Sequence, residues 1–183
     1  MIPSEEEAIA LHQKHGSSQV VIQHCRTVAK VSMILVDEFQ SRGVRVDSDA
    51  VEAGALLHDI GRSKVQTVWH GFEGAELVEK DGVDEKVVSI VRRHVGAGIS
   101  PDEAKRLGLP PFDYIPSTLE ERIVCFADKM VDSNKVRPLE KEVQRFASKG
   151  HDVNRLLGLK SRLYEELGED PEALVLEKFK ETG

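Results

Sequence analysis

The sequence predicts an all-α protein, and three observations favour this fold class. Apolar residues recur at intervals of three and four along most of the chain, which is the spacing of one helix face. No window alternates apolar and polar residues between turn signals, so no strand is predicted. Hydrophobic residues make up 40% and charged residues 31% of the 183 residues, as is typical of globular proteins. We therefore expect a single domain over residues 1–183 with one core.

Composition and charge argue against several classes of function. The formal net charge is −7 and no lysine- or arginine-rich run occurs, so we expect no general nucleic-acid-binding surface. No apolar run approaches the roughly 20 residues that span a membrane, and the acidic start MIPSEEEAIA does not look like a signal peptide. We expect a cytoplasmic protein with no membrane partner. Cys25 and Cys125 are predicted to be buried, reduced thiols.

Caps and glycines define the helices expected in the first third of the chain. Gly16 ends the first helix, whose first turn holds three glutamates, and Gly43 ends a long second helix. The apolar residues of that second helix place His24 on its buried face. Asp47 or Ser48 caps a third helix. These helices are expected over residues 4–14, 18–42 and 47–58.

The middle of the chain predicts two short helices after a polar loop over residues 62–67. His70 opens the first, in which Gly74 and Ala75 permit a close approach of a neighbouring backbone. Asp84 caps the second, and His94 follows on the face formed by its apolar residues. A short turn is expected over residues 100–107, followed by a proline-containing connector.

The last third predicts four helices. Ser117 and Glu120 match a capping box, which begins a helix that carries Asp128 among its apolar residues. After Pro138 come amphipathic helices without inward-facing acids or histidines. These are expected over about 139–149, 152–167 and 171–180.

Six acidic or imidazole side chains are predicted at helix ends or on apolar helix faces. Burying such groups is costly unless a metal or an opposite charge satisfies them. Simple alternatives exist for single residues, such as His58 capping a helix C-terminus, but one metal centre explains the whole set. Imidazole and carboxylate ligands without thiolate suit iron, manganese, cobalt, nickel or zinc. The six are His24, His58, Asp59, His70, His94 and Asp128, whereas His12, His15 and His151 are interpreted as surface or loop residues.

The number of predicted ligands favours two metals over one. With one bridging carboxylate, six ligands fit two metals about 3.5–4 Å apart, an arrangement used for displacement at phosphorus.

The ordered pattern H…HD…H…H…D resembles the HD superfamily of metal-dependent phosphohydrolases, and its binuclear branch most closely. The resemblance covers about residues 18–134. It rests on HDIGR after AGALL, on His70 with Gly74-Ala75, on His94 before a glycine-containing turn, and on FADK around Asp128. The implied fold is an HD-domain helical bundle, with residues 138–183 as a C-terminal helical extension.

The resemblance implies roles for individual residues. His24, His58 and Asp128 would hold one metal, His70 and His94 the other, and Asp59 would bridge them. The implied nucleophile is a metal-bridging hydroxide. It would cleave a phosphate ester or anhydride of a nucleotide or another small phosphorylated metabolite. Iron or manganese is favoured as the metal.

The resemblance also implies a basic substrate contact. Arg62, directly after HDIG, would hold a phosphate oxygen. Lys64, Arg92, Arg93 and Lys129 could assist, although a solvated charge explains each of them equally well.

The sequence is also compatible with two other functions and with self-association. The chain could be a non-catalytic nucleotide-binding regulatory module, or an oxygenase that uses the same ligands for a mixed-valent di-iron site. The absence of a GYP motif after the HD core argues against cyclic dinucleotides as substrates. The expected partner is a small phosphorylated substrate, and a homodimer is also compatible with the sequence.

Overall fold

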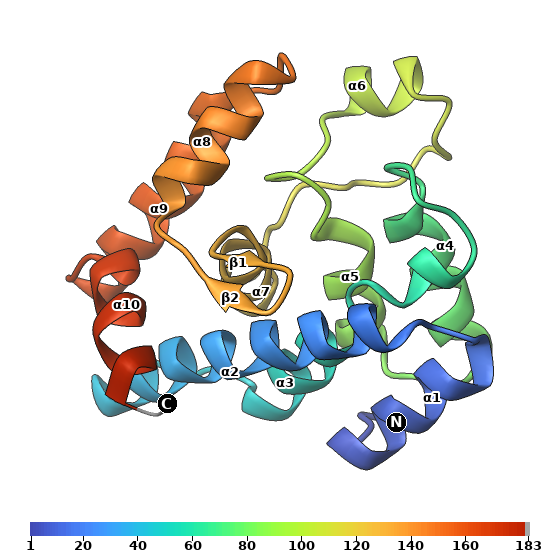
Figure 1. Ribbon diagram of the computed structural model, residues 1–183, viewed down its shortest axis with the longest axis horizontal. Coiled ribbons are helices and arrows are strands. Elements are labelled where there is room, and N and C mark those ends of the chain that lie inside the picture. Colours follow the sequence, from blue (N-terminus) through green and yellow to red (C-terminus); the bar gives the residue numbers. More distant parts are fainter. Residues whose placement is uncertain (182–183) are drawn as a thin grey trace.

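The computed structural model describes residues 1–181 and confirms the all-α prediction (Figure 1). The last two residues of the expected C-terminal extension lie outside this range. Ten α-helices and one short hairpin occupy the described residues. The helices are α1 Glu5–His15, α2 Gln19–Ser41, α3 Ser48–Leu57, α4 His70–Lys80, α5 Glu85–Arg93, α6 Pro101–Arg106, α7 Leu119–Lys129, α8 Leu139–Ser148, α9 Val153–Leu167 and α10 Pro171–Glu181. A 3-10 turn, η1, covers Ile60–Ser63, and the strands are β1 Val131–Asp132 and β2 Lys135–Val136.

The long helix α2 is the base on which the other helices pack. It lies against α3, α7 and α10, and α3 in turn packs on α5 and α7. Val28, Leu35 and Phe39 on α2 are fully buried, at the spacing expected of one helix face. Both cysteines are free and buried, as predicted. Within residues 1–181, we find no helix that combines the length and the apolar character needed to cross a membrane.

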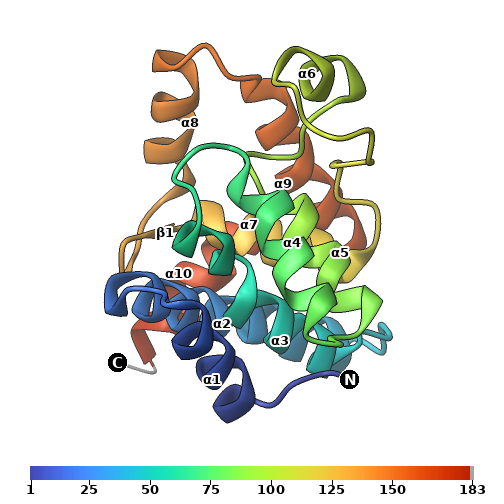
Figure 2. The same cartoon turned by 90° about the vertical axis from the view of Figure 1, so that its right-hand side faces the viewer.

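The C-terminal helices pack on the same core as the predicted HD region. Leu156 and Leu163 of α9 are fully buried in the main hydrophobic cluster. Lys178 of α10 contacts Glu38 of α2 at 2.7 Å, and Arg42 donates to the carbonyl of Leu167 at 2.6 Å. Helix α8 rises from the hairpin toward α6, so both stand at the end of the molecule away from α2 (Figures 1 and 2).

A second, smaller cluster supports the segment that contains α6. It joins residues after α5 to the start of α4, and the indole of Trp69 donates to the carbonyl of Leu107 at 3.3 Å. This cluster therefore fixes α6 beside the loop before α4. Its buried members are Val95, Ile99, Ala104, Leu109 and Tyr114.

The prediction of no strand was wrong after α7. β1 and β2 form an antiparallel pair with Val131 opposite Val136. Two residues per strand are too few to produce a visible alternation of apolar and polar residues. Ser133 takes the left-handed conformation in the turn, with φ of 58°.

The capping box of α7 begins one residue later than predicted. The sequence contains two overlapping matches, because both Ser117 and Thr118 precede a glutamate by three residues. The structure uses Thr118 and Glu121. Glu121 is buried and also accepts hydrogen bonds from Ser117 and from Arg93. These additional contacts select the second match.

The interpretation of His12 as a surface residue was also wrong. Its side chain is 0% exposed, because α1 packs on α3. His12 Nε2 donates to the carbonyl of Leu56 at 2.8 Å, and Nδ1 lies 2.8 Å from Ser17 Oγ. His15 is half-buried and contacts Asp81 at 2.6 Å, whereas His151 lies exposed between α8 and α9, as predicted.

The close backbone approach predicted at Gly74 is present and involves Gly61. A Cβ atom on Gly61 would lie 2.0 Å from the carbonyl oxygen of His70 and 2.5 Å from the nitrogen of Gly74. Both neighbours are backbone atoms, so a side chain at position 61 would displace α4 from η1.

We expect Gly61→Ala to lower the free energy of unfolding by about 3 kcal/mol, since neither backbone can relax without losing helix contacts. Chemical denaturation measures this change. Gly158→Ala is the matched control, because Gly158 lies in α9 with no atom near its Cβ position. That change should leave stability equal or raise it by about 0.5–1 kcal/mol. Equal stability of the two variants would contradict the argument from close approach.

Candidate metal centre

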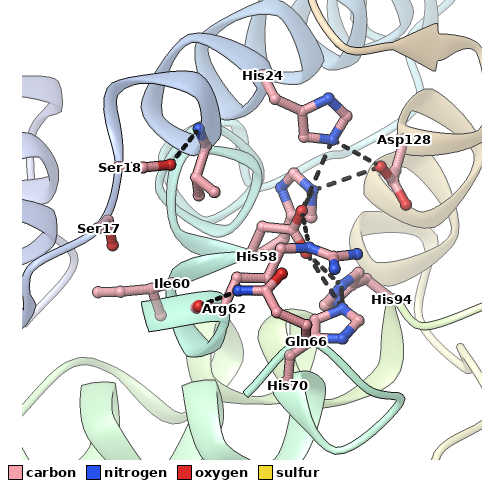
Figure 3. A network of polar contacts seen from close by, with 12 residues as sticks. Ser17, Ser18, His24, His58, Ile60, Arg62, Gln66, His70, His94 and Asp128 are labelled. Carbon is pink, nitrogen blue, oxygen red and sulfur yellow. Dashed lines mark hydrogen bonds and ion pairs between the residues drawn. The ribbon is translucent and has the colours of Figure 1, made fainter. Parts of the chain in front are cut away.

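The structure brings all six predicted side chains together, although they come from five segments of the chain (Figure 3). His24 projects from the first half of α2, and His58 and Asp59 follow α3. His70 begins α4, while His94 directly follows α5. Asp128 lies at the end of α7. Helix ends thus supply most of the centre, because a side chain there can leave the apolar face that buries its helix.

Asp59 lies between two pairs of histidines. Its Oδ1 is 3.1 Å from His70 Nε2 and 3.4 Å from His94 Nε2. Its Oδ2 is 3.9 Å from His24 Nε2 and 3.8 Å from His58 Nε2. The ligand atoms of each pair and of Asp59 lie within 4.8 Å of one another. One oxygen of Asp59 therefore faces each of two candidate metal positions.

Asp128 completes the first of these positions. Its Oδ1 is 3.0 Å from His24 Nε2 and 3.4 Å from His58 Nε2. The arrangement gives three side chains on one side of Asp59 and two on the other. This division matches the one implied by the resemblance.

The four imidazoles are oriented by backbone carbonyls. Because a carbonyl oxygen only accepts, each Nδ1 donates its proton, and each Nε2 is left with a lone pair directed inward. The partners are Ser133 for His24 at 2.8 Å, Ala55 for His58 at 2.8 Å, Thr67 for His70 at 2.7 Å and Val91 for His94 at 2.7 Å.

These inward lone pairs need a cation. His70 Nε2 and His94 Nε2 lie 3.0 Å apart, and two lone pairs at that distance repel unless a positive charge lies between or beside them. His58 Nε2 and Asp59 Oδ1 are buried without any hydrogen-bond partner. Unsatisfied buried acceptors are costly in proteins. The donor set therefore fits bound divalent cations.

The protonation states also suit metal binding. Burial opposes ionisation of Asp59, but positive charge on His58 and the protonated forms of His70 and His94 hold the pKa of its carboxyl well below the usual range, and bound cations would take over that role from the ring protons. Burial likewise opposes ionisation of Asp128, yet Lys129 and His24 hold its pKa low. Burial lowers the pKa of His94 to about 4. Two ionised carboxylates and a neutral imidazole are the forms that ligate metals.

Of the predicted basic residues, the structure brings only Arg62 and Lys129 to the centre. Arg62 Nε donates to Asp59 Oδ2 at 2.6 Å, and Lys129 forms an ion pair with Asp128 Oδ2. Lys64 is exposed and is not among the residues that line the cleft containing the centre. The turn η1 ends at Ser63, so Lys64 already belongs to the following loop.

Arg92 and Arg93 do not face the centre either. Arg92 is buried with its guanidinium 4.5 Å from the ring centroid of Phe112. Arg93 donates to Glu121 at 2.9 Å and to Ser117 at 2.6 Å. Both cations thus hold the connector after α6 and the start of α7.

The centre lies in a cleft of about 930 Å³. One wall is the loop that follows η1, and another is formed by residues 94–99 with part of α6. The third wall comes from α8 and the start of α9. The sequence predicted these helices but assigned them no site residue, because they carry no inward-facing acid or histidine. Arg145 and Lys149, four residues apart on one helix face, were the available signal.

Known proteins share this fold and much of this sequence. The family model described as HD domain matches residues 21–131. The tRNA (cytidine(56)-2'-O)-methyltransferase of Thermoplasma volcanium is 38% identical over 93% of the chain, which spans 49% of that relative's length. An uncharacterized protein of Methanocaldococcus jannaschii is 41% identical over 77% of the chain and 83% of its own length. The crystal structure of the HD domain of the L. monocytogenes phosphodiesterase PgpH superposes with a TM-score of 0.60. The two sequences are 16% identical, and the superposition covers 94% of this chain and 99% of the PgpH domain. This likeness shows a shared fold.

We expect close to two transition metals per chain in protein purified without chelator. Asp59→Ala should lose both metals, since its two oxygens face both positions, whereas His94→Ala should retain about one. Metal analysis of the purified variants measures this.

Asp132→Ala is the control for this experiment, because it removes an exposed carboxylate of the same cleft that belongs to neither group. It should keep both metals. Retention of two metals by the Asp59 variant would disprove the bridging role.

Proposed function

The chain belongs to the HD domain family, and we propose that it is a metal-dependent phosphohydrolase acting on a phosphate ester or anhydride of a nucleotide or a related metabolite. One observation carries the proposal. Asp59 is shared between two groups of imidazoles whose Nε2 lone pairs all face inward. Two adjacent cation positions joined by a carboxylate are suited to displacement at phosphorus.

The six side chains would hold two divalent cations, with iron or manganese favoured and cobalt, nickel or zinc also compatible. Such a pair would polarise a phosphate group and supply an activated water at neutral pH. The chain itself contributes charge and orientation. Lys129 neutralises Asp128 and fixes its direction, and the hydrogen bonds from Nδ1 to the backbone keep the four rings in place.

Arg62 is the side chain best placed to bind the substrate. Its Nε donates a hydrogen bond to Asp59. Because Arg62 lines the cleft, its two Nη groups remain available for a ligand there. A guanidinium held in this way can donate two parallel hydrogen bonds to a phosphate. The proposal therefore assigns Arg62 both to the orientation of Asp59 and to the binding of a phosphate oxygen.

The relatives support a nucleic-acid-derived substrate. One of them is named for methyl transfer to tRNA, and the chain spans about half of that protein. The methyl transfer named there has no counterpart in the His and Asp centre, so we propose hydrolysis for this part. A nucleotide or a nucleic-acid end is favoured over a sugar phosphate.

Hydrolysis of two chromogenic substrates, 4-nitrophenyl phosphate and bis(4-nitrophenyl) phosphate, tests the proposal. We expect release of nitrophenol with iron or manganese at equal rates with and without oxygen, and essentially none with Asp59→Ala. Intact metal content without turnover of either ester would favour a regulatory module. Substrate-dependent oxygen consumption in its place would favour the di-iron oxygenase.

Replacing Arg62 should separate its role from that of the metals. We expect Arg62→Ala to keep its metals, since removing a cation does not weaken the binding of another cation. Its kcat/KM for the phosphate ester should fall roughly 10- to 100-fold, the scale of one charge-assisted contact worth about 1.5–3 kcal/mol.

Arg62→Lys is the matched variant and should recover only part of the rate, because an ammonium cannot donate to Asp59 and to phosphate in the same planar geometry. Kinetics and thermal unfolding are measured on one preparation. A lower melting temperature with unchanged kinetics would assign Arg62 a purely structural role.

A further inference from the structure

The end of the cleft near α6 and α8 carries three basic side chains, two of which have no acidic partner. Arg106 ends α6 and Lys149 follows α8, and within residues 1–181 neither side chain forms an ion pair or a hydrogen bond. Arg145 is 61% exposed and makes only a 3.5 Å contact with Glu142 of its own helix. All three line one cleft, Arg106 from α6 and the other two from α8 and the residue that follows it. We call them the distal basic group.

The other cations of the cleft each form an ion pair with a carboxylate, and Arg62 among them keeps its Nη groups for the phosphate at the metal centre. Arg62 and Lys129 are paired with the carboxylates of the metal centre. Arg155 donates to Glu103 at 2.7 Å and to the carbonyl of Gly98 at 2.9 Å, which ties α9 to the segment before α6. Away from the metal centre, positive charge available to a ligand is therefore concentrated in the distal basic group.

Glu142 of α8 contacts Arg145, but two other acids near this group are engaged elsewhere. Asp152, which is close to Lys149 in sequence, accepts hydrogen bonds from the backbone of Asn154 and Arg155 at the start of α9. Glu103 caps α6 and is paired with Arg155. A ligand anion would thus meet little competition for Arg106 and Lys149.

Lys149, at the far end of α8, is too far from the metal centre for one phosphate to contact both. Helix α8 begins at Leu139, shortly after Ser133, whose carbonyl accepts from His24 at the centre. A rise of 1.5 Å per residue places Lys149 about 15 Å farther along the helix axis. A ligand that uses both ends must carry at least two anionic groups on an extended backbone.

Apolar and aromatic surface lies beside these charges. Leu107, which follows Arg106 in the chain, is 43% exposed and lines the cleft. His151 lines it as well, with its ring packed against that of Phe146 at 5.5 Å between centroids. Cations alternating with apolar or aromatic surface are typical of grooves that bind single-stranded nucleic acids. A polyphosphate would gain nothing from the apolar part.

We propose that the cleft binds the end of a short single-stranded oligonucleotide. The reacting phosphate would lie at the metal centre, a backbone phosphate farther along would contact the distal basic group, and a base would contact the apolar surface. This inference rests on the proposed phosphohydrolase function and narrows its substrate class. RNA and DNA share the chemistry that the cleft recognises.

The experiment compares two double variants with equal net charge. Arg106→Gln with Lys149→Gln removes two charges of the distal basic group. The control, Lys105→Gln with Lys141→Gln, removes two exposed charges from the same two helices outside the cleft. Both changes lower the formal net charge from −7 to −9, because each removes two positive charges.

Binding is measured on the metal-loaded proteins by fluorescence anisotropy. The probes are five-nucleotide RNA and DNA strands with phosphorothioate linkages, which keep the charge and resist hydrolysis. We expect the cleft variant to bind at least one strand type about tenfold more weakly or worse, and the control to bind like the original protein. The slope of log K against log[salt] should become shallower by about 0.7 in the cleft variant, since about 0.7 is lost per single-strand phosphate contact and the distal basic group contacts one backbone phosphate.

Kinetics distinguish a failure of this inference from a failure of the proposed function. We expect kcat/KM for unmodified five-nucleotide strands to fall at least tenfold more than kcat/KM for bis(4-nitrophenyl) phosphate in the cleft variant. Normal ester hydrolysis with equal strand binding by both double variants would overturn the distal site alone. Absence of ester hydrolysis in the original protein would overturn the phosphohydrolase function. Competition by tripolyphosphate as strong as that by the strands would overturn the assignment to oligonucleotides.

Discussion

The sharing of one buried carboxylate between two groups of imidazoles is the constraint on which the site and much of the fold depend. Asp59 is 5% exposed, so its negative charge needs positive partners on both sides. The backbone around it is fixed by the close contact of Gly61 with His70 and Gly74, which places His70 against Oδ1. A movement of η1 would therefore change both groups together. The close backbone contact at Gly61 is therefore needed to keep Asp59 between the two groups of imidazoles.

The composition of the centre could be predicted from the sequence because burying an acid or imidazole is costly. Asp128 and His94 interrupt apolar helix faces, and such interruptions are rare without a partner. The order of the motif then implied which residues share a metal. The sequence could not indicate that each imidazole donates Nδ1 to a carbonyl, since this depends on local backbone geometry. Two of those carbonyls, from Ala55 and Val91, lie in the helix that precedes their histidine, and a third, from Thr67, lies in the bend before α4.

The incorrect predictions share a physical cause, which is that tertiary contacts decide between local alternatives. His12 lies in a polar helix, yet the packing of α1 on α3 buries it against a free carbonyl. Thr118 caps α7 in place of Ser117 because Glu121, its capping-box partner, also accepts a hydrogen bond from Arg93. Fold class and helix boundaries depend mainly on local periodicity and were accordingly predicted well.

The acidic surface and the cations of the cleft act at different ranges. At physiological ionic strength, charges separated by more than about 8 Å are largely screened. Arg106 and Lys149 therefore add little to the potential at the metal centre and can act on a ligand only by direct contact. The net charge of −7 disfavours loose association with polyanions over the whole surface. A cleft that concentrates its unpaired cations at one end, within a protein that repels polyanions elsewhere, favours a strand that enters by its end over one that lies along the surface.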